Sequence, residues 1–290
     1  MSGPMSGGVR KGASPSMSVG AIGGGGRPGT EDRRRVVWVT VAVLTAVVTA
    51  LFCGSQAWAM ANRHTATRTY AMTHHGVRTV EIYGGVGSVR VVPGGRDRVE
   101  VAEKLVWSKG TPRVDRTWVG DTLQVRTGCP GTGFVLVQAL QCQVALVVTV
   151  PEAASVYAAT SAGTVDVRGV VGDVTTRTGS GSTRLEGLRG AVDARTGSGE
   201  ITGDSLESAR TTARAGSGSV LLGYAAAPAA VTVVTGSGSA EVVVPPGGRY
   251  RTEGATGSGS RTIAPGLQDP GATGVLDLSA GSGSVSVHYR

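Results

Sequence analysis

The chain has 290 residues, of which 40% are hydrophobic and only 4% are aromatic, and its formal net charge is +8. Residues 1–61 hold six basic and two acidic side chains, so residues 62–290 keep 22 basic and 18 acidic groups, a net charge of only +4. So small an excess over so long a segment excludes the basic footprint of a nucleic-acid-binding protein.

Residues 1–35 are rich in glycine, serine and proline and show no apolar periodicity, which is typical of a disordered tail. Residues 36–60 then contain no charged side chain. As a helix this segment would be about 37 Å long, at about 1.5 Å per residue, which exceeds a hydrocarbon core of about 30 Å. We therefore expect a transmembrane helix over residues 36–60.

This apolar segment is either retained as an anchor or cleaved. The basic residues before it place the N-terminus in the cytoplasm by the positive-inside rule; they are Arg10, Lys11, Arg27, Arg33, Arg34 and Arg35. The segment would then be an uncleaved signal anchor, followed by a stalk over residues 61–76. The alternative is a signal peptide cleaved after Ala59, because Ala57-Trp58-Ala59 has the form preferred at a cleavage site. In both cases residues 77–290 lie outside the cytoplasm.

In the first part of this extracytoplasmic segment, Val77 to Val150, apolar and polar residues alternate less regularly than in the rest. We interpret this part as a cap and the first coils of one domain. A separate small β-domain is the alternative.

Cys129 and Cys142 lie thirteen residues apart on what would be the oxidising side of the membrane, so we predict that they form a disulfide. Closing such a loop would stabilise the fold by roughly 3 kcal/mol. Two buried free thiols are the alternative.

From Ala162 to Ser284 a short glycine-centred corner recurs seven times, and a short alternating apolar run follows each corner. The second glycines of these corners are Gly163, Gly181, Gly199, Gly218, Gly238, Gly259 and Gly283. Their spacing of 18 to 24 residues is the period of a stacked repeat architecture. Glycine accepts the positive φ of a tight corner at no steric cost. A flexible linker, the alternative for Gly/Ser-rich sequence, would show no alternation.

One repeat, Thr178 to Arg195, consists of a corner, the strand T-R-L-E, the turn G-L-R-G and the strand A-V-D-A-R. Two short strands in eighteen residues are the content of one coil of a β-solenoid. A sandwich would need longer strands and Asn-Gly or Asp-Gly hairpin turns. We therefore predict an all-β fold, a parallel β-solenoid over residues 77–290 whose coils stack with their corners aligned.

Catalytic motifs are not recognisable in this sequence. Phosphate loops, calcium-binding glycine-rich turns and the G-x-S-x-G nucleophile elbow all differ from these corners in spacing or residue type, and no histidine has a metal ligand at a suitable spacing. Candidate acids exist on outward positions of the coils, but none has an evident base; they are Asp166, Glu186, Glu200 and Glu241. We therefore expect no catalytic, cofactor-binding or metal-binding residues, and keep a polysaccharide-acting enzyme as a remote alternative.

The order of motifs resembles a known family. Val148 to Pro151 reads V-T-V-P, Thr160 to Gly169 reads T-S-A-G-T-V-D-V-R-G, and T-G-S-G corners follow. This succession resembles the bacterial putative-adhesin family of β-strand-repeat envelope proteins, a domain of unknown function, over about residues 77–290. The resemblance implies an extracytoplasmic β-solenoid, often tethered to the membrane, with roles in adhesion or envelope stress and no catalytic residues.

These observations lead to a functional hypothesis: a single-pass cell-envelope protein that displays a non-enzymatic, adhesin-like binding surface. Its partners would be envelope polymers or a membrane sensor protein, and an envelope-stress regulator acting through such a sensor is the alternative. Binding should be spread over many outward side chains, among them Arg168, Arg184, Arg195 and Glu200. We expect charge reversal of several arginines together to weaken attachment to an anionic polymer.

Overall fold

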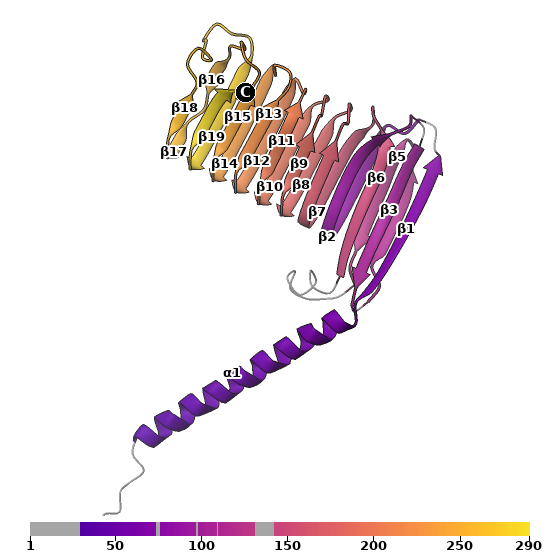
Figure 1. The fold of residues 1–290 in the computed structure, drawn as a ribbon, viewed down its shortest axis with the longest axis vertical. Helices are drawn as coiled ribbons and strands as arrows, with labels where there is room; N and C mark the ends of the chain where they lie inside the picture. The colour runs from indigo at the N-terminus through magenta and orange to yellow at the C-terminus, as the bar shows by residue number, and fades with distance from the viewer. Residues whose placement is uncertain (1–29, 74–75, 97, 109, 131–141) are drawn as a thin grey trace, which may run out of the picture. The chain divides into compact units, whose positions relative to one another are not determined.

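The computed structural model describes residues 30–73, 76–96, 98–108, 110–130 and 142–290 (Figure 1). It separates the chain into two units, residues 1–55 and residues 56–290. Most of the expected tail, residues 1–29, lies outside the described residues, and so do His74 and His75 of the expected stalk.

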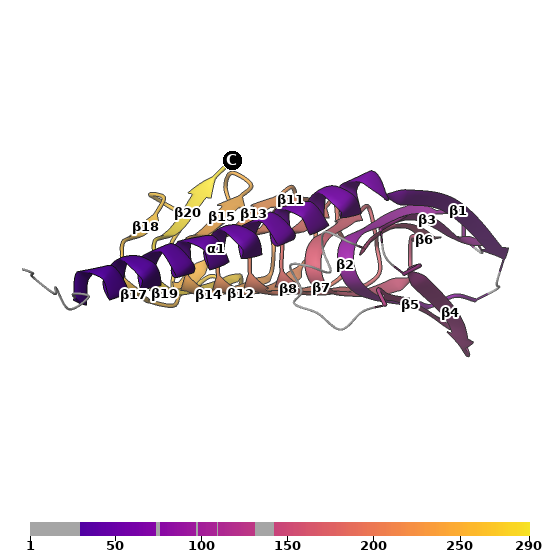
Figure 2. The same cartoon turned by 90° about the horizontal axis from the view of Figure 1, so that it is seen from below.

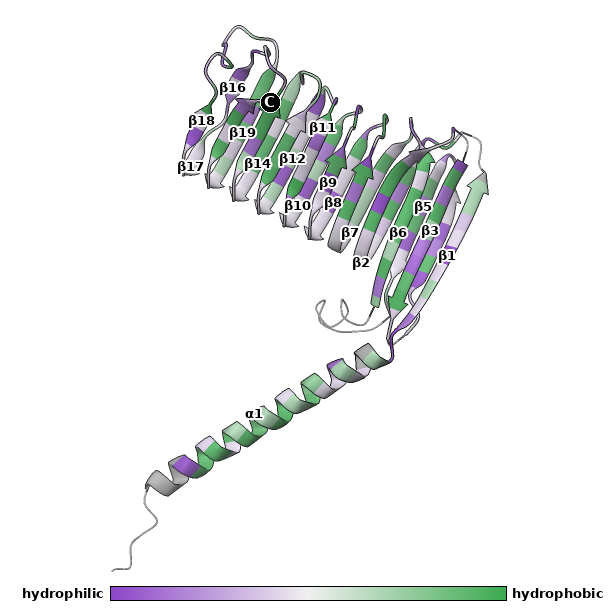
Figure 3. Ribbon diagram, in the orientation of Figure 1, coloured by the Kyte–Doolittle hydropathy of each residue, from purple (hydrophilic) through white to green (hydrophobic). Residues whose placement is uncertain are grey.

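The helix α1 (Thr30–Ala61) contains the apolar segment and begins six residues before the expected span. Within it, Arg35–Trp58 has a mean hydropathy of 2.5 and is long enough to cross a membrane. Figure 3 shows this apolar surface on the helix. The hydroxyls of Thr40, Thr45 and Thr49 donate hydrogen bonds of 2.7 to 2.8 Å to the carbonyl oxygens four residues earlier. The hydroxyls of these three threonines therefore all have an acceptor within the helix.

The second unit is a β-solenoid in which each complete coil contributes one strand to each of two faces (Figures 1 and 2). The first face contains β8 (Val174–Ser180), β10 (Val192–Ser198), β12 (Arg210–Ser217), β14 (Ala230–Ser237) and β19 (Val275–Ser282). The second face contains β9 (Thr183–Glu186), β11 (Ile201–Leu206), β13 (Val220–Tyr224), β15 (Ala240–Val244) and β20 (Val285–Tyr289). All these strands pair in parallel with the equivalent strand of the next coil, so the prediction of a parallel β-solenoid is confirmed.

The core lies between the two faces and follows the alternation of the strands. In β8, Val174, Thr176 and Thr178 are buried, whereas Thr175 and Arg177 point outward. The equivalent residues of the next coils repeat this pattern in register, as the alternating bands of Figure 3 show. Apolar side chains thus stack along the solenoid, and polar side chains form outward columns at the strand spacing of about 4.8 Å.

The corners between the two faces also stack. All seven expected corner glycines have φ between 134° and 146°, and Gly87, in an eighth corner, has a φ of 142°. The N–H of Gly181 donates a 2.9 Å hydrogen bond to the carbonyl of Ser198 in the next coil. A Cβ atom built on Gly181 would overlap the backbone carbonyl of Gly163 in the preceding coil. Only glycine allows the corners to approach so closely.

The N-terminal end of the solenoid is broader than the repeats. The long strands β2 (Thr79–Gly94) and β7 (Ser155–Arg168) each run through a corner and pair side by side on both faces. Beyond β2, the first face continues with β5 (Thr122–Gly128) and β4 (Arg113–Val119), and the second with β6 (Cys142–Pro151), β3 (Arg98–Trp107) and β1 (His64–Thr73). Since β1 pairs antiparallel with β3 along its whole length, this part of the expected stalk belongs to the sheet.

A disulfide joins Cys129, just after β5, to Cys142, at the start of β6, with 6.0 Å between their Cα atoms. The disulfide joins the end of β5 on the first face to the start of β6 on the second face. In the repeats, a glycine corner stands at this place. Cys53, the remaining cysteine, is free and exposed on α1.

An ion pair lies inside this N-terminal end. Glu103 of β3 is buried, and Arg116 of β4 donates a hydrogen bond to its carboxylate from the opposite face. The Arg116 guanidinium also lies 3.7 Å from the ring centroid of Tyr70 in β1. The two faces are therefore connected at their open end by a charged contact.

At the C-terminal end the order of the coils departs from the order of the sequence. The coil with Gly283, formed by β19 and β20, pairs directly with β14 and β15 of the Gly238 coil. The Gly259 coil, which precedes it in the sequence, covers its far side through β16 (Arg251–Glu253), β17 (Thr256–Ser258) and β18 (Arg261–Ile263). None of the residues of these three short strands is buried. The Gly259 coil thus caps the solenoid, with exposed or half-buried strands and with Tyr250 and Leu267 buried beside them.

Candidate functional site

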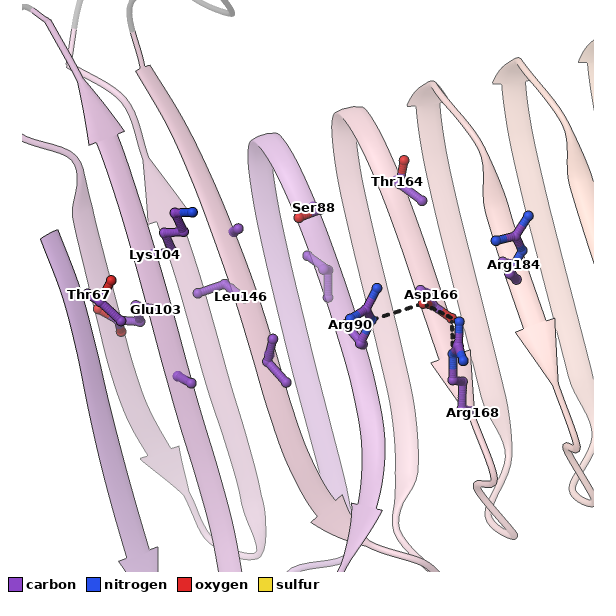
Figure 4. A pocket seen from close by; sticks show the side chains of 14 residues that line it. Thr67, Ser88, Arg90, Glu103, Lys104, Leu146, Thr164, Asp166, Arg168 and Arg184 are labelled. Atoms are coloured by element: carbon purple, nitrogen blue, oxygen red, sulfur yellow. Dashed lines mark hydrogen bonds and ion pairs between the residues drawn. The ribbon is translucent and has the colours of Figure 1, made fainter. Parts of the chain in front are cut away.

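A groove of about 560 Å³ crosses the outer surface of the second face, near the N-terminal end of the solenoid (Figure 4). Its lining comes from β1, β3, β6, β2, β7 and β9, which lie side by side in that order. Outward residues of these strands supply its charged and polar groups, which are Thr67, Ser88, Arg90, Lys104, Thr164, Asp166, Arg168 and Arg184.

Asp166 organises the centre of the groove. Its carboxylate is nearly buried and accepts a 3.0 Å hydrogen bond from Nε of Arg90 on the neighbouring strand β2. Arg168, two residues along β7, donates two further hydrogen bonds of 2.9 and 3.1 Å to the same carboxylate. Arg168 also lies 3.3 Å from a carboxylate oxygen of Glu186 on β9. Asp166 thus fixes the positions of two guanidinium groups.

Asp166 remains ionised in this setting. Burial raises the pKa of its carboxyl, but the hydrogen bonds from Arg168 and Arg90 more than offset that effect and hold the pKa below its usual value. The same contact raises the pKa of the Arg168 guanidinium. Near neutral pH the centre of the groove is therefore a stable cluster of one carboxylate between two guanidinium groups.

Two further cations stand at the ends of this cluster, as Figure 4 shows. Arg184 on β9 is in register with Asp166, and Lys104 lies on β3. Within the described part of the chain neither side chain has a carboxylate partner. With Arg90 and Arg168, they give the groove four cations. These face the carboxylate of Asp166 and that of Glu186 beside Arg168, since Glu103, the other acid that lines the groove, pairs with Arg116 in the core. The groove is therefore suited to bind anionic groups.

The arrangement offers little for acid–base catalysis. A general acid or base needs a pKa near the working pH and a second group in reach, whereas Asp166 is held ionised by two arginines. The other candidate acids lie apart from it or are already paired: Glu241 contacts His288 at 2.8 Å, Glu200 is exposed at a corner, and Glu186 shares Arg168. Among the described residues, no three His, Cys, Asp or Glu side chains are placed to hold a metal ion.

The structure brings together only part of the surface that the sequence suggested. Arg168 and Arg184 lie in the groove, whereas Arg195 lies on the first face and Glu200 at a corner. Sequence reasoning missed Arg90 and Lys104. Arg90 could not be connected with Asp166 because 76 residues separate them, and only the direct pairing of β2 with β7 makes them neighbours.

The fold and the groove define a β-solenoid protein with a basic surface groove. No family model and no curated protein matches the chain. Solved structures do resemble it: a "putative adhesin" from Parabacteroides distasonis with 11% identity and a TM-score of 0.48, which matches 77% of this chain and 97% of its own. A "putative cell adhesion protein" from Clostridium sporogenes has 12% identity and a TM-score of 0.39, over 78% of this chain and 100% of its own. A "putative adhesin" from Bacteroides fragilis has 10% identity and a TM-score of 0.38, over 78% of this chain and 97% of its own.

Proposed function

We propose that this protein is anchored in the membrane by α1 and displays its β-solenoid in the cell envelope as a non-enzymatic, adhesin-like surface. The observation that carries the proposal is the groove, in which Asp166 fixes Arg90 and Arg168 while Arg184 and Lys104 have no carboxylate partner among the residues that the structure describes. Guanidinium groups held in place bind carboxylates and phosphates through charge-assisted hydrogen bonds. The partner is therefore an anionic polymer of the envelope.

Membrane anchoring is supported by the length and hydropathy of Arg35–Trp58 and by the arginines before it. In reporter fusions to the full chain, we expect a reporter at residue 20 to be cytoplasmic and one at residue 150 to be extracytoplasmic. N-terminal sequencing of the mature protein is the second measurement. A mature protein that begins at Met60 would contradict the anchor and favour secretion.

Binding at the groove should depend on the two unpaired cations. We expect the double variant Lys104→Glu/Arg184→Glu to weaken binding to an anionic polymer by at least about tenfold at 0.1 M salt, because exposed charges interact within a Debye length of about 10 Å there. Binding of the full-length protein in detergent to immobilised polygalacturonate measures this effect, and the residual binding should depend less on salt.

The matched control is Arg249→Glu/Arg261→Glu, which changes the net charge by the same amount on the exposed C-terminal cap. We expect this variant to bind almost as the parent does. Equal losses in the two variants would mean that only net charge matters, and the groove would not be the binding site. If a single Asp166→Asn variant abolished a chemical conversion of the polymer with the fold intact, the protein would be an enzyme.

A further inference from the structure

The first face carries a second surface that the groove does not include. Across its outer side, two tyrosines and a row of arginines lie on consecutive strands from β5 to β12. They are Arg126, Tyr83, Tyr157, Arg177, Arg195 and Arg214, and we call them the tyrosine–arginine track.

The tyrosine end of the track is a stack of rings and cations. The rings of Tyr83 and Tyr157 have their centroids 5.5 Å apart. The Arg126 guanidinium lies 4.8 Å from the centroid of Tyr83, and the Arg177 guanidinium lies 5.8 Å from that of Tyr157. Both distances are within the range of a cation–π interaction. Both rings are half-buried, and each has a guanidinium over it and the other ring beside it, so the tyrosines hold Arg126 and Arg177 in place on this face.

The arginine end is a column of like charges. Arg177, Arg195 and Arg214 occupy the same position in the paired strands β8, β10 and β12, so their backbones are about 4.8 Å apart. Arg195 bonds to Asp193, at 2.9 and 3.2 Å, whereas Arg214 has no carboxylate partner among the described residues. Adjacent like charges in a sheet repel one another. An anionic ligand would relieve this repulsion.

The surface is hollowed along the same line. One depression of about 350 Å³ extends from Tyr83 to Arg177, and another of about 420 Å³ extends from Arg177 to Arg214. Both include Arg177 and Thr178, so the two depressions meet. Glycines line both of them, at Gly84, Gly179, Gly197 and Gly216, which leaves the space between the larger side chains open. From Tyr83 on β2 to Arg214 on β12 the track spans four strand spacings, or about 19 Å.

We propose that this track binds an acidic polysaccharide chain through carboxylates on Arg177, Arg195 and Arg214, while Tyr83 and Tyr157 hold Arg126 and Arg177 in place. The negative face of an aromatic ring attracts a guanidinium, and guanidinium groups pair with carboxylates through parallel hydrogen bonds. An acidic glycan repeats its carboxylates along one extended chain, as the arginines repeat along this face. The track lies on the opposite face from the groove and does not depend on binding there.

Binding of a fluorescent oligogalacturonate to the full-length Lys104→Glu/Arg184→Glu protein in detergent tests the proposal, because this parent no longer binds anions tightly at the groove. We expect Tyr83→Leu/Tyr157→Leu to weaken binding about tenfold, because leucine keeps the apolar packing but removes the aromatic faces that hold Arg126 and Arg177. Tyr83→Phe/Tyr157→Phe keeps those faces and should bind within about twofold of the parent. Arg177→Gln/Arg214→Gln should also weaken binding about tenfold and reduce its salt dependence, whereas Arg249→Gln/Arg261→Gln on the cap should not. Thermal unfolding confirms that each variant is folded.

Three outcomes would overturn the proposal. The first is unchanged affinity of the folded leucine or glutamine variants. The second is equally tight binding of a neutral oligosaccharide of the same length, which would deny a role to the carboxylates. The third is binding of polyphosphate or oligothymidylate of equal charge as tightly as the oligogalacturonate, which would make the ligand a phosphate chain or a nucleic acid. With Lys104 and Arg184 restored, the groove should bind the oligogalacturonate as well, so the leucine substitutions should then have a smaller effect.

Discussion

Replacing Gly181 with alanine should lower the free energy of unfolding of the neighbouring coils by more than about 3 kcal/mol. Two costs combine at this position. A non-glycine residue at the φ of Gly181, 145°, costs about 1–3 kcal/mol. The new Cβ would also overlap the carbonyl of Gly163, so the two corners would have to separate. Denaturant unfolding of the full-length protein measures the loss, and hydrogen exchange should show the coils around residue 181 opening before distant ones.

Gly187 provides the matched control. Its φ is also positive, at 60°, but a Cβ built there would meet no atom within 4 Å. Gly187→Ala should therefore cost only about 1–2 kcal/mol, the cost of the left-handed backbone alone. If both variants lost the same stability, close stacking of the corners would contribute nothing and only the local φ would matter.

Replacing Glu103 with alanine should destabilise the protein by about 3–5 kcal/mol, because removal of one partner leaves the other charge unpaired in the interior. Glu103 is almost fully buried, and its partner Arg116 reaches it from the opposite face. Denaturant unfolding monitored by the tryptophans near this end, Trp107 and Trp118, measures the effect.

Two further variants test whether the loss of stability comes from the unpaired buried charge. Glu207→Ala removes an exposed ion pair with Arg189, of 3.0 Å, and should cost about 0–1 kcal/mol. The double variant Glu103→Leu/Arg116→Leu removes both buried charges and should recover much of the loss. A Glu103→Ala protein as stable as Glu207→Ala would show that water reaches Arg116 and that the pair does not hold the two faces together.

The repeats could be predicted from the sequence because their signals are local. Alternation such as Val192, Ala194 against Asp193, Arg195 defines strands, and the glycine period defines the corners that connect them. Corner spacing does not reveal which coil contacts which, so the exchange of the Gly259 and Gly283 coils was not predicted. A signal was present in composition: residues 251–253 are polar, whereas Val275–Leu278 and Val285–Val287 alternate as buried strands do.

Neither the groove nor the tyrosine–arginine track could be predicted from the sequence, for one physical reason. Between β2 and β7 the sequence contains β3 to β6, which lie at the end of the solenoid, and β7 then pairs directly beside β2. This pairing brings Arg90 to Asp166 and Tyr83 to Tyr157 over more than 70 residues. β1 lies at the edge of the sheet, paired with β3, although residues 61–76 had been predicted to be a stalk.

The exchanged order of the last coils has a consequence for biosynthesis. Repeats up to Gly238 can add to the growing stack one after another as the chain emerges, each on the coil made before it. The Gly259 coil cannot do so, because the surface on which it rests, β19 and β20, is made after it. It must remain unpaired until those later strands insert beneath it. The solenoid therefore grows in the direction of translation except at this step, which requires β19 and β20 to have been synthesised.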